Sequence, residues 1–188
     1  MKNDEQEEPT GAALRWPDLV DAVCRVKCAP APHISSVNPG SWKHKPVLLL
    51  WGLSRWDDGE RYFQYVEWAE TFDTVLSPVI SDARGPEQPF WRLQNDGGTG
   101  RPPIWSVQSP LEVELGSHPL SSRELTDAHA IGKFTTWVER LLSDIEDGPL
   151  LLAREVVSHH LRSSKLFPQR RIEAICDAVE APAAAVTG

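Results

Sequence analysis

Residues 89–97 read PFWRLQNDG. Apolar and polar residues alternate along its middle, which is typical of a half-buried strand, so a strand is predicted over residues 90–95. Alternation would point Trp91 and Leu93 toward one side of that strand. The opposite side would carry Phe90, Arg92 and Gln94. The pattern alone favours an ordinary half-buried strand with a solvated arginine, although a ring beside a cation and an amide also suits a binding surface.

Two further segments join this strand in a predicted small antiparallel sheet. Residues 104–107 follow a connection rich in glycine and proline at 97–103. In residues 111–115, three apolar residues alternate with two glutamates, as they do in a strand with one face in the core. A short strand is also expected at residues 61–65, directly after an Asp-Gly turn.

Helices are predicted on both sides of this region. Before it, apolar residues at helical spacing predict helices over residues 16–27, 47–56 and 66–76, and the second is apolar nearly all round, as a central helix is. After it, three apolar stripes predict three more helices. The stripes are Phe134, Trp137, Val138, Leu141 and Ile145; Ala153, Val156, Val157 and Leu161; and Ile172, Ile175, Cys176 and Val179. The expected fold is mainly α with a small antiparallel β-sheet (α+β), in a single compact domain.

Composition divides the chain into three parts. Residues 1–14 are acidic and polar, so a disordered tail is expected there. Residues 15–180 form the predicted domain. Residues 181–188 are small, as in a flexible linker leading toward a domain that this chain lacks.

The overall composition is that of a soluble globular protein, with 40% hydrophobic and 24% charged residues. No apolar run approaches the roughly 18 residues that span a membrane, and the N-terminus lacks the order of a signal peptide, so no membrane partner and a cytoplasmic location are expected. Three cysteines, at positions 24, 28 and 176, argue by their odd number against a disulfide framework. Cys24 and Cys28 are assigned to helix packing, because no nearby ligands complete a metal site.

Sequence motifs of common enzymes are missing. The chain has no glycine-rich phosphate loop, no GxSxG and no HExxH. His159 and His160 are neighbours on a predicted helix, so their side chains diverge and do not share a metal easily. No catalytic residue, metal or cofactor is therefore predicted, and nothing resembles an HNH nuclease centre.

The PFWRLQNDG segment resembles the signature of the sulfur-binding domain in McrA-like, HNH-type restriction endonucleases that depend on phosphorothioate modification. Further segments resemble the same family in the same order: residues 45–50, the regions 120–124 and 132–134, and Leu166-Phe167-Pro168 before the last helix. The resemblance covers residues 15–180.

One position departs from the family pattern. Family members often have an aromatic residue just before the Pro-Phe pair, whereas this chain has Gln88. If that aromatic residue lines the sulfur pocket, Tyr62, Tyr65 or Trp42 must replace it, and the sequence does not choose among them.

The resemblance implies that the chain recognises phosphorothioate-modified double-stranded DNA. Sulfur is a weaker hydrogen-bond acceptor than oxygen and more polarizable, so an apolar pocket strands an ordinary phosphate oxygen and accepts sulfur. The predicted sulfur pocket consists of Pro89, Phe90 and Arg92. The predicted contacts to phosphates and bases are Lys43, His44, Lys45, Gln94, Asn95, Arg101 and Arg123. Cleavage would belong to a separate nuclease domain, through which a homodimer would form.

Several alternatives stay open at this stage. Residues 43–45 can be a solvated helix entry, Arg101 a loop tip, and Arg123 the partner of Glu124 or Asp127. The net charge of −8 argues against a general DNA binder, but a protein that must ignore ordinary DNA gains from weak attraction to phosphate. The rival function is a protein-interaction module that uses exposed tryptophans. A complete small hydrolase is disfavoured by the missing motifs.

Overall fold

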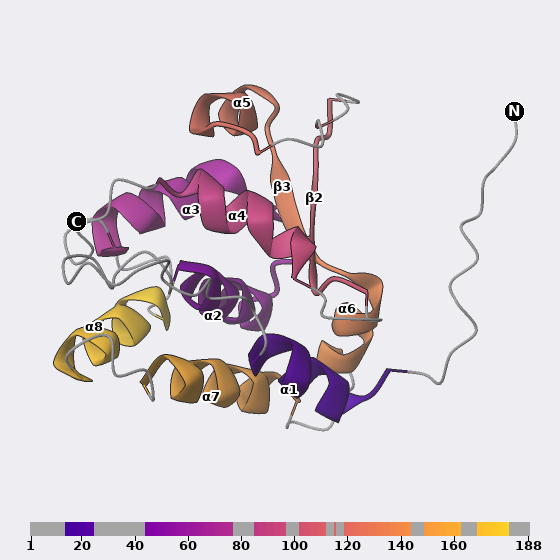
Figure 1. Cartoon of the computed structure of the whole chain (residues 1–188), viewed down its shortest axis with the longest axis vertical. Coiled ribbons are helices and arrows are strands. Elements are labelled where there is room, and N and C mark those ends of the chain that lie inside the picture. Colours follow the sequence, from indigo (N-terminus) through magenta and orange to yellow (C-terminus); the bar gives the residue numbers. More distant parts are fainter. Residues whose placement is uncertain are drawn as a thin grey trace, which may run out of the picture.

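The computed structural model describes residues 14–24, 44–76, 85–96, 102–111, 115, 119–143, 149–162 and 169–180. Helices pack around a central one and a three-stranded sheet lies beside them (Figure 1). The helices are α1 (Trp16–Cys24), α2 (His44–Asp57), α3 (Tyr65–Thr71), α4 (Glu87–Arg92), α5 (Ser122–Asp127), α6 (Thr136–Leu142), α7 (Pro149–Arg162) and α8 (Gln169–Glu180), with a π-helix η1 (Phe72–Leu76) and a 3-10 helix η2 (Leu93–Asn95). The strands are β1 (Phe63–Gln64), β2 (Trp105–Gln108) and β3 (Ile131–Phe134).

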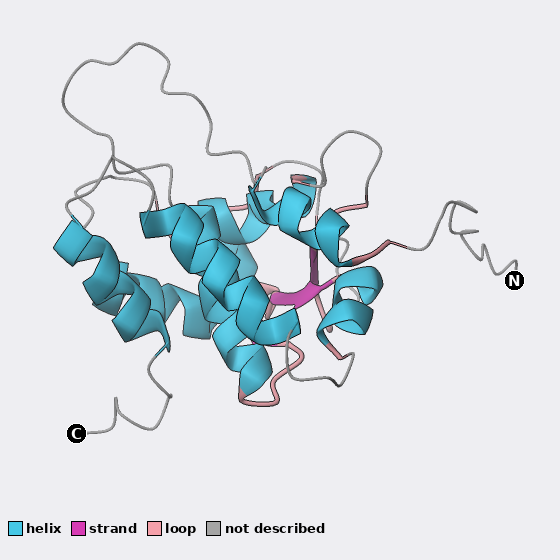
Figure 2. Cartoon of the chain, turned by 90° about the horizontal axis from the view of Figure 1, so that it is seen from below, coloured by secondary structure: helices cyan, strands magenta, loops and turns pink. Residues whose placement is uncertain are grey.

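Helix α2 is the centre of the molecule, as its sequence predicts. It lies between α3 and α4 on one side and α7 and α8 on the other (Figure 1). Its residues 47–51 are all buried, on every side of the helix, because packed elements surround it. The strands lie among the helices when the molecule is seen from below (Figure 2). The predicted class, mainly helical with a small antiparallel sheet, is confirmed.

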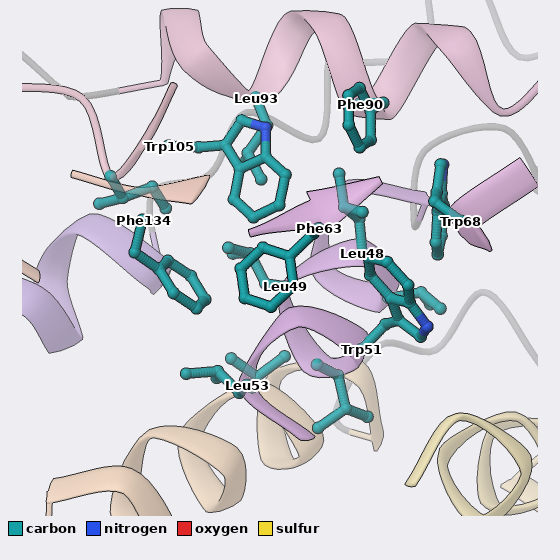
Figure 3. Close-up of a cluster of buried hydrophobic side chains, with 14 of the residues drawn as sticks. Leu48, Leu49, Trp51, Leu53, Phe63, Trp68, Phe90, Leu93, Trp105 and Phe134 are labelled. Atoms are coloured by element: carbon teal, nitrogen blue, oxygen red, sulfur yellow. The ribbon is translucent and has the colours of Figure 1, made fainter. Parts of the chain in front are cut away.

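Aromatic rings fill the core between α2 and the sheet (Figure 3). Phe63 stacks on Trp105 with ring centroids 5.5 Å apart, and Phe134 meets both rings edge to face at 5.6 Å. Six of the eight tryptophans are buried: Trp51, Trp56, Trp68, Trp91, Trp105 and Trp137. Trp16 is partly buried and Trp42 lies outside the described residues. The tryptophans therefore serve mainly as core, and this does not favour a protein-interaction surface built from them.

The predicted strand at residues 90–95 is wrong. This segment forms the last part of α4 and then η2. Phe90 and Trp91 are consecutive and both buried, which a strand with one buried face cannot achieve, because neighbouring side chains on a strand point to opposite sides. A proline in the first turn of a helix costs no hydrogen bond there, so Pro89 is compatible with α4.

The sheet has the order β1-β3-β2, and both pairs are antiparallel. Its central strand, β3, is missing from the strands that the sequence predicts, because the apolar spacing places Phe134 in a helical stripe. Gly132 faces the core from β3, and a Cβ atom there would lie 2.0 Å from Cζ2 of Trp105. A glycine is therefore needed at this position.

The remaining predicted elements are found with small shifts, as far as they are described. The strand expected at residues 61–65 is β1, reduced to two residues, and the helix expected at 66–76 is α3 followed by η1. The predicted strand at 111–115 is described only at its ends: Leu111 lies in a turn, and Leu115 has no regular structure. Ile145 and Cys28 lie outside the described residues.

Candidate nucleic-acid interface

An ion pair joins two segments that lie 51 residues apart in the sequence. Nζ of Lys45, in the first turn of α2, lies 2.6 Å from Oδ2 of Asp96, the residue after η2. The two side chains are 17% and 4% exposed. Because Asp96 follows Gln94 and Asn95 directly, the pair brings three of the predicted contact residues together. We call Lys45, Gln94, Asn95 and Asp96 the α2–η2 junction.

Asp96 was not among the predicted site residues. Its only sequence signal is its place in the sequence Asn-Asp-Gly, a pattern typical of a turn in which an aspartate commonly serves the backbone alone. Its carboxylate is nearly inaccessible to solvent, and a charge in such a place requires a partner. The ammonium of Lys45 is that partner.

Helix α4 divides its residues between the core and the surface. Phe90 is 0% exposed, and its ring meets the rings of Tyr65 at 5.2 Å and Trp105 at 5.7 Å. Arg92, two residues later, is exposed. The prediction that Phe90 and Arg92 share one side is therefore wrong, because it assumed the periodicity of a strand. Pro89 is buried as well.

The surface of α4 and η2 carries a different set. Gln88 and Arg92 are separated by four residues on α4, so they lie on the same side of the helix, and exposed Asn95 follows three residues later. Gln88 is half-buried, and its amide donates a hydrogen bond of 3.4 Å to Oε1 of Glu87. We call Gln88, Arg92 and Asn95 the α4 ridge. It combines a cation with two amides and adjoins the α2–η2 junction through Asn95.

The structure narrows the choice of an aromatic replacement at Gln88. Tyr65 is 1% exposed, and its hydroxyl makes a 2.5 Å hydrogen bond with Ser122 Oγ, so it has no surface for a ligand. Burial raises the pKa of Tyr65 to about 12. Tyr62 is 60% exposed, and Trp42 lies outside the described residues.

Arg123 lies apart from these residues, on α5. Its side chain is 91% exposed, and its Nε lies 3.5 Å from Oδ2 of Asp127 one turn later. A capping box between Ser121 and Glu124 begins the helix. The predicted alternative, that Arg123 pairs with Asp127, is therefore observed, although an exposed pair of this kind leaves the guanidinium accessible.

Three predicted contacts lack a described side chain. Lys43 and Arg101 lie outside the described residues, and His44 begins α2 without a described side chain.

Many of the described cations are neutralised locally. Besides Lys45 and Arg123, Arg154 lies 2.7 Å from Asp57 and Arg55 lies 4.0 Å from Glu60. Arg61 stacks over the ring of Trp56 at 3.7 Å. Arg92 has no acidic partner among the residues that the structure describes, and the same holds for Lys133. Arg92 is therefore the cation of the α4 ridge, and no described acidic side chain neutralises it.

Among the described residues, no three or more His, Cys, Asp or Glu side chains are grouped so that they could hold a metal ion. No described helix is long and apolar enough to cross a membrane.

Three solved structures share this fold. The sulfur binding domain of SprMcrA complexed with phosphorothioated DNA superposes with a TM-score of 0.58 at 19% identity, covering 89% of this chain and 98% of that one. The sulfur binding domain of ScoMcrA complexed with phosphorothioated DNA gives 0.57 at 18% identity, covering 86% and 98%. A structure of the sulfur binding domain and SRA domain of ScoMcrA complexed with phosphorothioated DNA also gives a TM-score of 0.57 at 18% identity. The superposition covers 83% of this chain but only 45% of that longer chain.

A search of curated proteins found no match. A family model, however, matches residues 19–169, which include most of the described helices and all three strands. By that match, the chain belongs to the family of ScoMcrA-like DNA sulfur-binding domains.

Proposed function

We propose that this chain binds double-stranded DNA that carries a phosphorothioate, and that it does so where the α4 ridge meets the α2–η2 junction. The observation that carries the proposal is the Lys45–Asp96 ion pair, which places the start of α2 beside the Gln94-Asn95 segment. The family supplies the ligand class, since solved structures of its sulfur-binding domains hold phosphorothioated DNA.

Cations and apolar atoms have different roles at this site, because a phosphate and a phosphorothioate differ in one atom but not in charge. A phosphorothioate keeps the negative charge of a phosphate, so cations attract both and cannot tell them apart. Preference for sulfur requires apolar atoms that leave a phosphate oxygen without a hydrogen bond. We propose that Pro89, buried on α4 one turn before exposed Arg92, supplies these apolar atoms. Phe90 is wholly buried, so we propose that it supports the position of Pro89 without contacting the DNA itself.

The exposed amides suit the flanking bases. Asn95 is exposed and Gln94 is half-buried, and amide side chains donate and accept hydrogen bonds in the way that base edges require. Arg92, Lys45 and the more remote Arg123 supply attraction to phosphates, which positions the duplex. Lys43, His44 and Arg101 belong to the same proposal.

The chain itself is proposed to be a targeting module without catalytic activity. Cutting of the DNA would then belong to a separate HNH nuclease domain of a modification-dependent restriction endonuclease that acts in bacterial defence in the cytoplasm, and a homodimer would form through that domain. The longer ScoMcrA structure, in which a sulfur-binding domain accompanies an SRA domain, supports such a multidomain arrangement.

The test is a binding titration with two duplexes of one sequence, plain and with a single Rp-phosphorothioate. The modified duplex should bind at least tenfold more tightly, a margin of about 1.4 kcal/mol. The same duplexes should remain intact in Mg²⁺ or Mn²⁺. Equal affinity for the two duplexes would refute the proposed function, and a matched Sp-phosphorothioate duplex shows whether one sulfur position is read.

A further inference from the structure

We infer that Asp96 is a specificity-determining residue, which fixes the Lys45 ammonium in one position and thereby suppresses binding to unmodified DNA. The inference rests on the proposed function and deepens it. It starts from the least exposed charge of the interface, since the Asp96 side chain is only 4% exposed.

The geometry fixes both partners. Asp96 closes η2, where its backbone N–H donates to the carbonyl of Leu93 at 3.0 Å, and Leu93 itself is fully buried. The carboxylate is therefore held by the core and not by a flexible loop tip. Lys45 Nζ donates to that carboxylate at 2.6 Å from a half-buried side chain. The ammonium has three N–H donors, so two remain for a phosphate.

A fixed cation and a free cation act differently on DNA. A free lysine on a long side chain follows the phosphates of any sequence in any register, and it strengthens non-specific binding. A lysine held at one point serves a phosphate only when the duplex sits in the register that this point allows. The adjacent carboxylate also offsets part of the positive charge at longer range. Asp96 thus lowers the electrostatic attraction to any phosphate, which does not depend on sulfur. It still favours the one binding register of the duplex in which the sulfur contacts the pocket.

The decisive variant is Asp96→Asn, which keeps the shape of the side chain but removes the charge that holds the Lys45 ammonium in place. Its affinity for the plain duplex should rise about threefold, the effect of one charge at about 6 Å in water. Its affinity for the Rp-phosphorothioate duplex should stay unchanged, because the gain in attraction is offset by the lost placement of Lys45. The preference for the modified duplex should therefore fall about threefold.

The matched control is Asp57→Asn, which removes one charge from an ion pair at the other end of α2, with Arg154. Asp57 lies about 18 Å from Lys45 along the helix axis, farther than charges act through physiological salt. This variant should bind both duplexes as the unaltered protein does. If Asp57→Asn and Asp96→Asn behave alike, or if Asp96→Asn strengthens both duplexes equally, the inference is wrong.

A double variant, Lys45→Gln with Asp96→Asn, protects the test against misfolding of the single one. It removes both charges and frees no ammonium, so binding to the plain duplex should not rise while binding to the modified duplex weakens. A double variant that kept the full preference would overturn the inference. If the unaltered protein shows no preference at all, the proposed function fails, while the predicted rise in plain binding for Asp96→Asn still tests the role of Asp96.

Discussion

Among the single residues of the interface, Lys45 has two roles, and a substitution there affects both DNA binding and stability. As a proposed phosphate contact it invites substitution by alanine. As the partner of a buried carboxylate it is also part of the folded structure. A loss of DNA binding in Lys45→Ala therefore has no meaning until the stability of the variant is known.

We predict that Lys45→Ala lowers the free energy of unfolding by about 3–5 kcal/mol, because it leaves the Asp96 charge buried and unpaired. Urea denaturation followed by tryptophan fluorescence measures this, and the buried tryptophans make a strong reporter. Lys45→Gln with Asp96→Asn should recover most of the loss. A stable Lys45→Ala protein would show that water or another group satisfies the carboxylate.

The site residues that could be predicted are those whose chemistry requires solvent. Arg92 and Asn95 are exposed as expected, because charged and amide groups are costly to bury. Phe90 and Asp96 could not be assigned in this way. The ring of Phe90 suits a pocket and a core equally well, and Asp96 was concealed by its turn motif, since its partner is distant in the sequence.

Among the helices, α5 buries Leu125 in the core and also has a polar link to α3. The buried hydroxyl of Tyr65, in the first turn of α3, bonds to Ser122 in the first turn of α5. The same ring packs against Phe90 of α4. Tyr65 therefore links the helix that carries Arg92 with the helix that carries Arg123.

We predict that Tyr65→Phe costs about 1 kcal/mol at neutral pH, the usual contribution of one hydrogen bond. The pKa of Tyr65 is about 12 in the folded protein and 10.0 otherwise, so the unfolded chain releases this proton first as pH rises. Folding stability should fall between pH 10 and 12 in the unaltered protein. Denaturation across that range should show a smaller fall in Tyr65→Phe, and an identical fall in both proteins would exclude Tyr65 as its source.

Sequence patterns predict some of these elements and not others. Helix α2 was predictable because its apolar run is longer than a typical strand, so a buried helix is the structure it favours. The segment after Pro89 was not, because its apolar–polar alternation spans only residues 91–94, which is too short to exclude a helix, and only the joint burial of Phe90 and Trp91 decides. Strand β3 is four residues long and contains a glycine and a lysine, so it lacks the usual strand composition.

For the protein as a whole, the net charge of −8 and the local pairing of several cations predict a weak general attraction to DNA. Arg92 is the exception among the described cations of the interface. The salt dependence of binding should therefore be shallow and sensitive to this one residue.

We predict that Arg92→Ala reduces the slope of log affinity against log salt by about 0.9 for both duplexes, the contribution of one neutralised phosphate. The ratio between modified and plain affinities should change little if Arg92 acts as a rim cation. Titrations at four salt concentrations measure this, with melting curves as the control for folding. An unchanged slope would remove Arg92 from the phosphate contacts, whereas a loss confined to the modified duplex would move it into the pocket.

The order of strands in the sheet has a consequence for synthesis. The middle strand, β3, is the last of the three to leave the ribosome, and Gly132 is the residue against which both Phe63 and Val107 are paired. Until residue 134 has emerged, β1 and β2 have no strand between them with which to pair. The rings of Phe63 and Trp105 then also lack their contact with Phe134. A nascent chain stalled before that point should be a client of chaperones, and one stalled well beyond it should resist protease.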